Sequence, residues 1–499
     1  MTSRVPPNRK TIVTAIFGDK GMTYFWQARF LPRWLPLLLG LVLGVFLAFL
    51  IVNGAWIFVF ALLLLVPLAI LFNAYPFATV IIWLLVMPFF EVTPTAAGRY
   101  VYWMLHRAMI PAGLGMVVLS RLLRAKTYQP VRLCRAELAV GIFTGLVPIS
   151  IFLFQPEVNA SLILFYDRIF VSYCMYLLVR LATPREKDIR GLLVAALVMA
   201  ISQSIVGLLS WFAPHVLPRQ WLALQGFRTT GTFRQPGPYT VLLVFSIALL
   251  FQGAMNREPG LLRFVFLSAF GLGAVCVFLS LSRGSWLGGL LVATGLLILF
   301  PKPMMRMAVV ILVIMALLRG GLLSSQMAAA SERMKQESSV DDRVGITHAM
   351  FTMIKLKPFF GWGYGNQNRY SGQFIRRTDD TPIVSTKLSS HNTFLTIAAE
   401  LGLVGFFLYM FPFAWWLMLT IKILPRMPEK GLWSRSLLIV LWLIIVNHIV
   451  VGNFIDLRYT PFGHALWWLT LGLVANLVFP YLDPGDTGAP GWARQVGLI

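Results

Sequence analysis

The sequence predicts an all-α fold, a polytopic membrane bundle of about 12–14 transmembrane helices with one long, partly helical extracytoplasmic loop. The composition is 58% hydrophobic and only 12% charged, whereas soluble domains carry about 25% charged residues. Apolar runs of about 18 residues or more recur along the chain, far too many to bury in one globular core. These runs are continuous rather than alternating, which favours helices over barrel strands.

Fourteen apolar runs are candidate helices. In chain order they cover 34–52, 55–73, 77–91, 103–120, 137–155, 160–180, 191–212, 237–254, 264–281, 285–300, 307–322, 393–420, 436–453 and 461–480. Residues 1 to about 30 contain no long apolar run. We therefore expect no cleavable signal peptide, and we expect the first span to start membrane insertion without being cleaved.

Lysines and arginines of the short loops indicate how the spans are oriented. Most of them fall on the side of both termini, which is therefore expected to be cytoplasmic. Residues 1–33 and 482–499 then form cytoplasmic tails, 34–322 hold the first eleven spans, 323–392 form the long outer loop and 393–481 hold the last three spans. Residues 213–236, Ser280–Ser285 and Asn453–Arg458 fall on the same side as the loop. The conspicuous polar residues of the chain thus gather on one face.

The charge and cysteine content exclude several classes of protein. The net charge of +23 is spread over many short loops, which fits membrane orientation and anionic lipid headgroups better than nucleic-acid binding. The three cysteines have neither disulfide nor metal-site spacing. Without a metal-ligand cluster or a cytoplasmic phosphate-binding glycine loop, we expect no metal and no cofactor.

Two arginine-containing connections are candidate anion sites. Arg283 lies between apolar runs joined by a connection too short to leave the membrane surface, where an arginine is costly unless it is paired or wetted. It either reaches up to headgroups or binds an anion, and Gly284 and Ser285 would let a diphosphate approach closely. Arg228 opens a loop rich in Gly, Thr and Arg, and such a loop offers guanidinium groups to an anion.

The long loop holds two further candidate elements. Arg343 follows Asp341 and Asp342, one of which is expected to cap an amphipathic helix over Val344–Lys355; Arg343 either pairs with these aspartates or binds an anion. A glycine-punctuated aromatic turn follows and is either a sugar platform or an interfacial anchor. Its candidate sugar-binding residues are Trp362, Tyr364 and Asn366.

His391 is the candidate general base. It lies where the loop re-enters the membrane as a long helix, and the unperturbed pKa of histidine is close to working pH. A nearby arginine cluster would keep the ring neutral and able to accept a proton, whereas a lone histidine there would be only a polar cap. His448 and His464 lie in or beside spans and are expected to pack helices.

The order of these elements resembles the O-antigen ligase and O-antigen polymerase superfamily. The resemblance covers about 225–410 and rests on Ser-Leu-Ser-Arg283-Gly-Ser-Trp-Leu, Asp342-Arg343 before a helix, Pro-Phe-Phe-Gly-Trp-Gly-Tyr-Gly-Asn366, and Ser-His391-Asn-Thr-Phe-Leu followed by Ala-Glu-Leu-Gly-Leu-Val-Gly. It implies a metal- and nucleotide-independent, inverting membrane glycosyltransferase of the GT-C type. The implied donor is a glycan on undecaprenyl diphosphate, and the implied acceptor is a glycan or lipid A-core. The implied place is the outer face of a bacterial inner membrane.

By the same resemblance, Arg283 and Arg343 would bind the diphosphate, with Arg228 as a further candidate, and His391 would activate the acceptor hydroxyl or assist the diphosphate. A ligase, a polymerase and a protein O-oligosaccharyltransferase all stay open. A lipid-linked oligosaccharide transporter is the alternative from another class, and it predicts charges within spans, broken helices and pseudo-symmetric halves.

Overall fold

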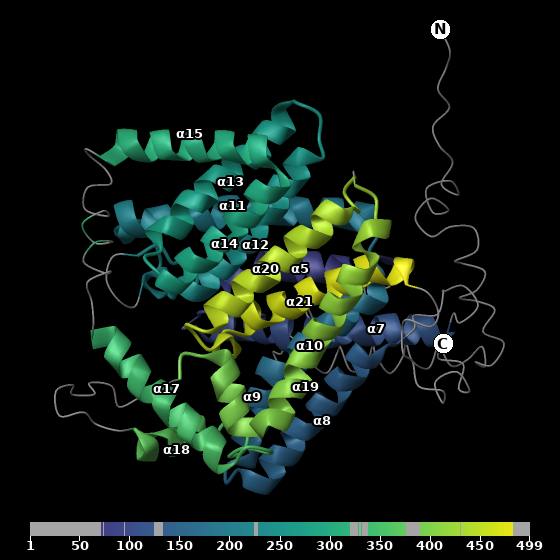
Figure 1. The fold of residues 1–499 in the computed structure, drawn as a ribbon, viewed down its shortest axis with the longest axis vertical. Coiled ribbons are helices and arrows are strands. Elements are labelled where there is room, and N and C mark those ends of the chain that lie inside the picture. Colours follow the sequence, from purple (N-terminus) through teal and green to yellow (C-terminus); the bar gives the residue numbers. More distant parts are fainter. Residues whose placement is uncertain are drawn as a thin grey trace, which may run out of the picture. The chain divides into compact units, whose positions relative to one another are not determined.

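The computed structural model describes residues 71–482, except for 73, 94, 124–132, 224–227, 320–327, 329–330, 332–337, 376–389 and 430. The span expected over 34–52, nearly all of that over 55–73, and nearly all of both tails lie outside these residues. Figure 1 shows the described helices along the chain.

The helices follow one another without any strand in the described ranges. They are α5 (Ala78–Val86), η1 (Met87–Phe89), α6 (Ala96–Tyr102), η2 (Trp103–Met109), α7 (Ile110–Leu123), α8 (Arg135–Phe154), α9 (Val158–Phe165), η3 (Tyr166–Phe170), α10 (Val171–Ala182), α11 (Glu186–Phe212), η4 (Pro214–Val216), η5 (Arg219–Trp221), α12 (Pro236–Met255), α13 (Leu261–Leu279), α14 (Arg283–Leu299), α15 (Pro301–Arg319), α17 (Ser338–Leu356), α18 (Gln367–Tyr370), η6 (Ser371–Phe374), α19 (Thr393–Ile423), η7 (Leu424–Arg426), α20 (Arg435–Gly452), η8 (Leu457–Tyr459), α21 (Pro461–Val478) and η9 (Phe479–Tyr481).

Nine helices in the described part of the chain are long and apolar enough to cross a membrane. The predicted all-α membrane bundle is therefore confirmed. Two expected spans are shorter apolar helices, Ala78–Phe89 and Arg283–Leu299. The described part of the span expected over 307–322 lies in α15, which begins at Pro301 and is not among the nine.

Helices α12 and α21 form the centre of the bundle. Nearly every residue of both is buried, from Gly237 to Ala254 and from Phe462 to Val478. Helix α12 packs against α11, α13 and α20, while α21 packs against α10, α19 and α20. A continuous apolar run is what a helix needs when other helices surround it on all sides.

Buried ion pairs join neighbouring spans at two places. Arg107 in η2 donates to both carboxylate oxygens of Asp167 in η3, at 2.5 Å each. Arg180 lies 3.2 Å from Glu137 of α8, and both side chains are almost fully buried. Each of these charges is neutralised by a partner about forty or more residues away, as a charge within a span requires.

The described part of the long loop has a small core of its own. Met350 and Met353 of α17 pack against Ala399 of α19, with Trp362 and Phe374 beside them. The predicted amphipathic helix over Val344–Lys355 is present as part of α17. The predicted cap at Asp341 or Asp342 is wrong, because α17 begins at Ser338 and both aspartates lie inside it.

Helix α19 is broken at Gly402, which has φ 67° and ψ −174°. The turn that follows α17 fills the break: Trp362 N donates to Ala399 O at 3.0 Å, and Leu403 N donates to Pro358 O at 2.7 Å. A side chain at Gly402 would collide with the Phe359 carbonyl, so only glycine fits here. The loop is thus hydrogen-bonded to the point at which α19 changes direction.

Candidate functional site

The start of α19 holds His391 in an unusual backbone conformation. The Asn392 side chain caps the helix by accepting hydrogen bonds from Phe394 N and Leu395 N, at 3.0 and 2.9 Å. Asn392 N in turn donates to Ser390 Oγ at 3.2 Å. His391 lies between these two anchors with φ 49° and an exposed side chain. A non-glycine residue in the left-handed region is strained, and such strain clusters at functional sites.

The 453–460 connection between α20 and α21 is the hub to which this start is fixed. Asn392 Nδ2 donates to Asn453 Oδ1 at 3.1 Å. The Thr393 hydroxyl donates to Ile455 O at 3.1 Å and accepts from Leu457 N at 2.9 Å. These bonds tie the helix that follows His391 to a segment about sixty residues further along the chain. The sequence predicts that the loop and residues 453–458 are on the same side of the membrane, and the structure shows direct contacts between the end of the loop and this connection.

The charges around His391 favour its neutral form. Desolvation lowers the pKa of His391, the positive charge of Arg343 lowers it further, and the Asp456 carboxylate opposes both. The net direction is below the ordinary value of 6.5. At neutral pH the ring is therefore mostly unprotonated, which is the state in which it accepts a proton. The expectation was a cluster of arginines that keeps this ring neutral, whereas desolvation is the larger cause here and, among the described residues, Arg343 is the one arginine that contributes.

Arg343 is near enough for its charge to lower the pKa of His391, and it comes from α17, the helix that packs against α19. Arg343 lies about one helical turn before Ile346 and two turns before Met350. Both of these residues are buried, so Arg343 is on the side of α17 that faces the protein. Its side chain is half-buried. The structure thus brings together His391 and Arg343, two predicted site residues that are 48 positions apart in the numbering.

Arg283 is the first residue of α14 and is half-buried. It follows Leu281, which has φ 52°, so the turn before it is tightly constrained. The sequence predicts that Gly284 lets a diphosphate approach closely. In the structure the space beside Gly284 is occupied by a side chain. A Cβ there would meet the Phe454 ring at 2.6 Å, and the Ser285 hydroxyl lies 2.6 Å from that of Thr240. Both small residues serve helix packing, and Gly284 places Arg283 against the 453–460 connection.

Arg228 is half-buried and lies near the end of α13, the helix before the turn that leads to Arg283. The next residue, Thr229, donates from its hydroxyl to Cys276 O at 2.9 Å and from its backbone to Leu279 O at 3.3 Å. These bonds fix Arg228 at the end of α13, the helix that runs into Arg283. A chain of contacts thus runs from Arg228 through the Arg283 turn and the 453–460 connection to His391.

The predicted sugar-binding residues take part in packing. Tyr364 and Asn366 are 1% and 2% exposed, and Asn366 Nδ2 donates to Phe154 O at 3.2 Å and Trp362 O at 2.9 Å. The half-buried Trp362 donates to Met353 O at 2.9 Å, and the Lys357 ammonium lies 4.3 Å from its ring centre. These contacts dock the turn on α8 and α17. Sugar binding by the three residues stays a prediction, and a buried ring such as Tyr364 has no free face for it.

One buried cluster of charges was missed. Arg458 is 2% exposed and donates to Asp456 at 3.0 and 2.7 Å and to Glu400 at 2.9 Å. Glu400 also accepts from Gln367 N at 3.3 Å. The cluster therefore joins α19, the long loop and the hub, and it orients the carboxylate that opposes Arg343 at His391. The sequence signal that could have revealed this cluster is three charged residues in otherwise apolar surroundings. Such charges are costly unless they are paired.

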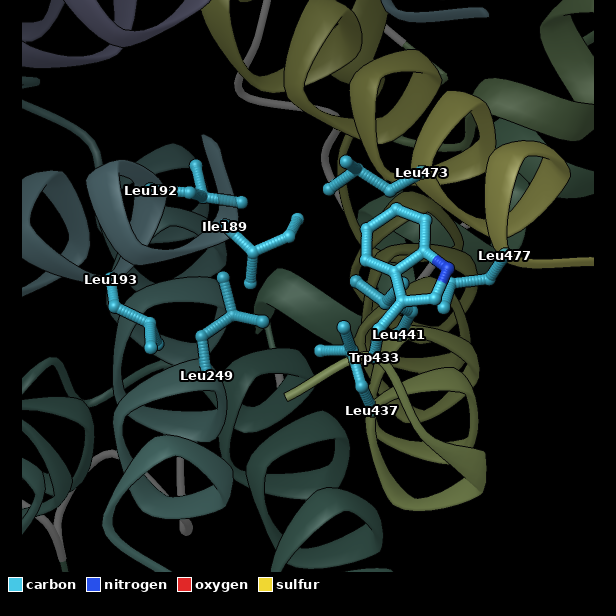
Figure 2. Close-up of a pocket in the computed structure, with 9 residues that line it drawn as sticks. All are labelled: Ile189, Leu192, Leu193, Leu249, Trp433, Leu437, Leu441, Leu473 and Leu477. Carbon is cyan, nitrogen blue, oxygen red and sulfur yellow. The ribbon is translucent and has the colours of Figure 1, made fainter. Parts of the chain in front are cut away.

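A cavity lies away from these residues. Its lining is apolar and includes Ile189 of α11, Leu437 of α20 and Leu473 of α21 (Figure 2). It offers no group that would act on a substrate. Among the residues that the structure describes, no cluster of three or more His, Cys, Asp or Glu is arranged to hold a metal ion. His464 packs helices as expected, since its ring bonds to Tyr409 and Ser172 at 2.8 Å each.

Comparison with known proteins adds one match. Residues 268–410 match the family described as O-antigen ligase. The matched segment contains Arg283, Arg343, His391 and the aromatic turn, whereas Arg228 and the 453–460 connection lie outside it. A search of the curated proteins finds no match.

Proposed function

We propose that this chain is an integral-membrane glycosyltransferase, because residues 268–410 match the family described as O-antigen ligase. It transfers a glycan from undecaprenyl diphosphate to an acceptor hydroxyl on the outer face of a bacterial inner membrane. The observation that carries the proposal is His391, a strained histidine at the membrane end of the loop, whose pKa is lowered by partial desolvation and by Arg343.

The proposed step needs a base and a cationic site. The acceptor oxygen forms a bond to the anomeric carbon while the bond from that carbon to the diphosphate oxygen breaks, and the configuration inverts. His391 takes the hydroxyl proton, as a neutral imidazole within hydrogen-bond reach can. Negative charge grows on the departing undecaprenyl diphosphate. Arg283 and Arg343, with Arg228 as a further ligand, stabilise that charge.

The placement of the arginines supports this division of roles. Arg283 is at the N-terminal end of α14, where the helix dipole also favours an anion. Arg343 approaches His391 from the loop. A lipid-anchored diphosphate must stay near the membrane surface, so a site shared between helix starts and a loop suits it better than one inside the bundle.

The test is transfer in vitro with purified protein in liposomes and a lipid-linked oligosaccharide. His391→Ala and Arg283→Ala should abolish transfer while the protein stays in the membrane. The matched controls are His348→Ala, an exposed histidine of α17, and Arg306→Ala, an exposed arginine of α15; both should keep activity. Wild-type turnover by the two site variants would sink the assignment.

The product distinguishes the reactions that the family includes. Mass spectrometry with and without a lipid A-core acceptor separates them: glycan moved to the core means a ligase, and longer lipid-linked chains mean a polymerase. The reaction should proceed in a chelator, and strict dependence on a divalent ion would count against the mechanism.

A lipid-linked oligosaccharide transporter is the second candidate, because α19 is broken and buried charges lie beside the break. Here, however, hydrogen bonds to the 358–363 turn pair the carbonyls of Ala399 and Glu400 and the amides of Leu403 and Val404, so these groups are not free to line a path. Movement of a labelled lipid-linked oligosaccharide across liposomes without any covalent product would favour the transporter.

A further inference from the structure

The end of α17 and the turn after it expose large apolar side chains. Phe351, Leu356, Phe359 and Phe360 are 51%, 58%, 67% and 59% exposed. Single exposed apolar residues are ordinary on any surface, but four within ten residues form a patch that is unfavourable in water. The patch therefore needs an apolar partner.

Hydrogen bonds fix the patch against α19, one of the helices that are long and apolar enough to cross a membrane. Val404 N donates to Phe359 O at 3.3 Å and Leu403 N donates to Pro358 O at 2.7 Å. One turn further along α19, Phe407 is 65% exposed, as expected of a side chain that faces lipid. Phe359 and Phe360 are thus held next to a membrane-facing helix surface.

The charge around the patch points to an anionic partner. From Arg343 to Ile375 the chain carries four cationic residues and neither aspartate nor glutamate. Two of the cations, Lys355 and Lys357, are exposed and flank Leu356. Aromatic and aliphatic side chains interleaved with lysines are the composition of segments that lie in the headgroup region of a bilayer.

We propose that residues 355–360 insert into the headgroup region of the bilayer on the loop's side and bind anionic phospholipid there. The three apolar side chains of this segment enter the acyl boundary, and the two lysines contact headgroup phosphates. Because Arg343 is on the same helix, this contact sets the height of Arg343 above the membrane. The inference does not depend on the reaction that the site performs.

Spin labels test the depth of the segment in liposomes. Cys134, Cys174 and Cys276 are buried, so a label on Phe359→Cys reports mainly on that position. Oxygen, which concentrates in the bilayer, should relax this label more than a water-soluble nickel complex does. Phe407→Cys is the lipid-facing reference and Gln373→Cys, an exposed polar position of the same loop, is the aqueous reference. A label at 359 that behaves like the one at 373 overturns the proposal.

The lipid requirement has its own readout. Vesicles of phosphatidylcholine alone are compared with vesicles that also contain phosphatidylglycerol. The anionic lipid should move the label at 359 deeper, and Lys355→Gln with Lys357→Gln should remove that difference. Equal depth in both vesicles overturns the anionic part of the proposal. Spin–spin broadening at 359 would mean that a second copy of the chain covers the patch, which also overturns it.

Discussion

Replacing Arg458 with methionine is expected to destabilise the protein strongly. The substitution removes three charge-assisted hydrogen bonds, two to Asp456 and one to Glu400, and leaves both carboxylates buried without their cation. Breaking a buried ion pair by deleting one partner costs roughly 3–5 kcal/mol. At the lower value, the ratio of folded to unfolded protein falls by more than about 100-fold.

The matched control is the same substitution at an exposed pair. Arg190 lies 2.9 Å from Glu186, and the two side chains are 64% and 55% exposed. Because solvent screens such a pair, Arg190→Met should cost about 0.5 kcal/mol or less. Both variants are compared with the wild type by heat-induced unfolding in one detergent, read as loss of the monodisperse species in size-exclusion chromatography.

A rescue experiment separates lost charge pairing from lost packing. Adding Glu400→Gln and Asp456→Asn to Arg458→Met removes the orphaned charges but keeps the side-chain shapes, so more than half of the lost stability should return. If Arg458→Met is as stable as Arg190→Met, or if the triple variant is no better than the single one, the cluster does not hold the break in α19 to the hub as we argue.

Three further predictions concern the site and its supports. The transfer rate should stay constant around neutral pH and fall as pH drops through the lowered pKa of His391, because protonation removes the base. Arg343→Gln should raise this pKa and so move the fall in rate to higher pH, which a pH–rate profile would show. Gly402→Ala should cost at least about 1–3 kcal/mol in thermal unfolding, since φ 67° with ψ −174° is a glycine conformation, whereas Gly145→Ala, with open space at its Cβ, should cost nothing measurable. Asn392→Ala should cost about 1 kcal/mol through the lost helix cap, and an unchanged unfolding temperature would contradict that role.

Much of the fold was predictable because it depends on local composition. A run of apolar residues long enough to cross a bilayer must form a helix wherever its neighbours lie, so the described spans were placed to within a few residues. The run over 307–322 lies in a helix that begins earlier than expected, at Pro301. The amphipathic helix of the loop was found from its pattern, but its start was misplaced, because the cap was assigned from the two aspartates alone.

The sequence by itself determined that the chain is a membrane helix bundle, and it singled out His391 and the arginines by residue type and order. Only the tertiary structure decided which groups meet. The charge of Arg343 lowers the pKa of His391 because α17 packs on α19, and the Arg458 cluster closes across 58 residues of chain. Gly402 breaks its helix because the Phe359 carbonyl occupies the space of its side chain. Such partners are set by long-range packing, whereas a local pattern fixes only what each segment forms by itself.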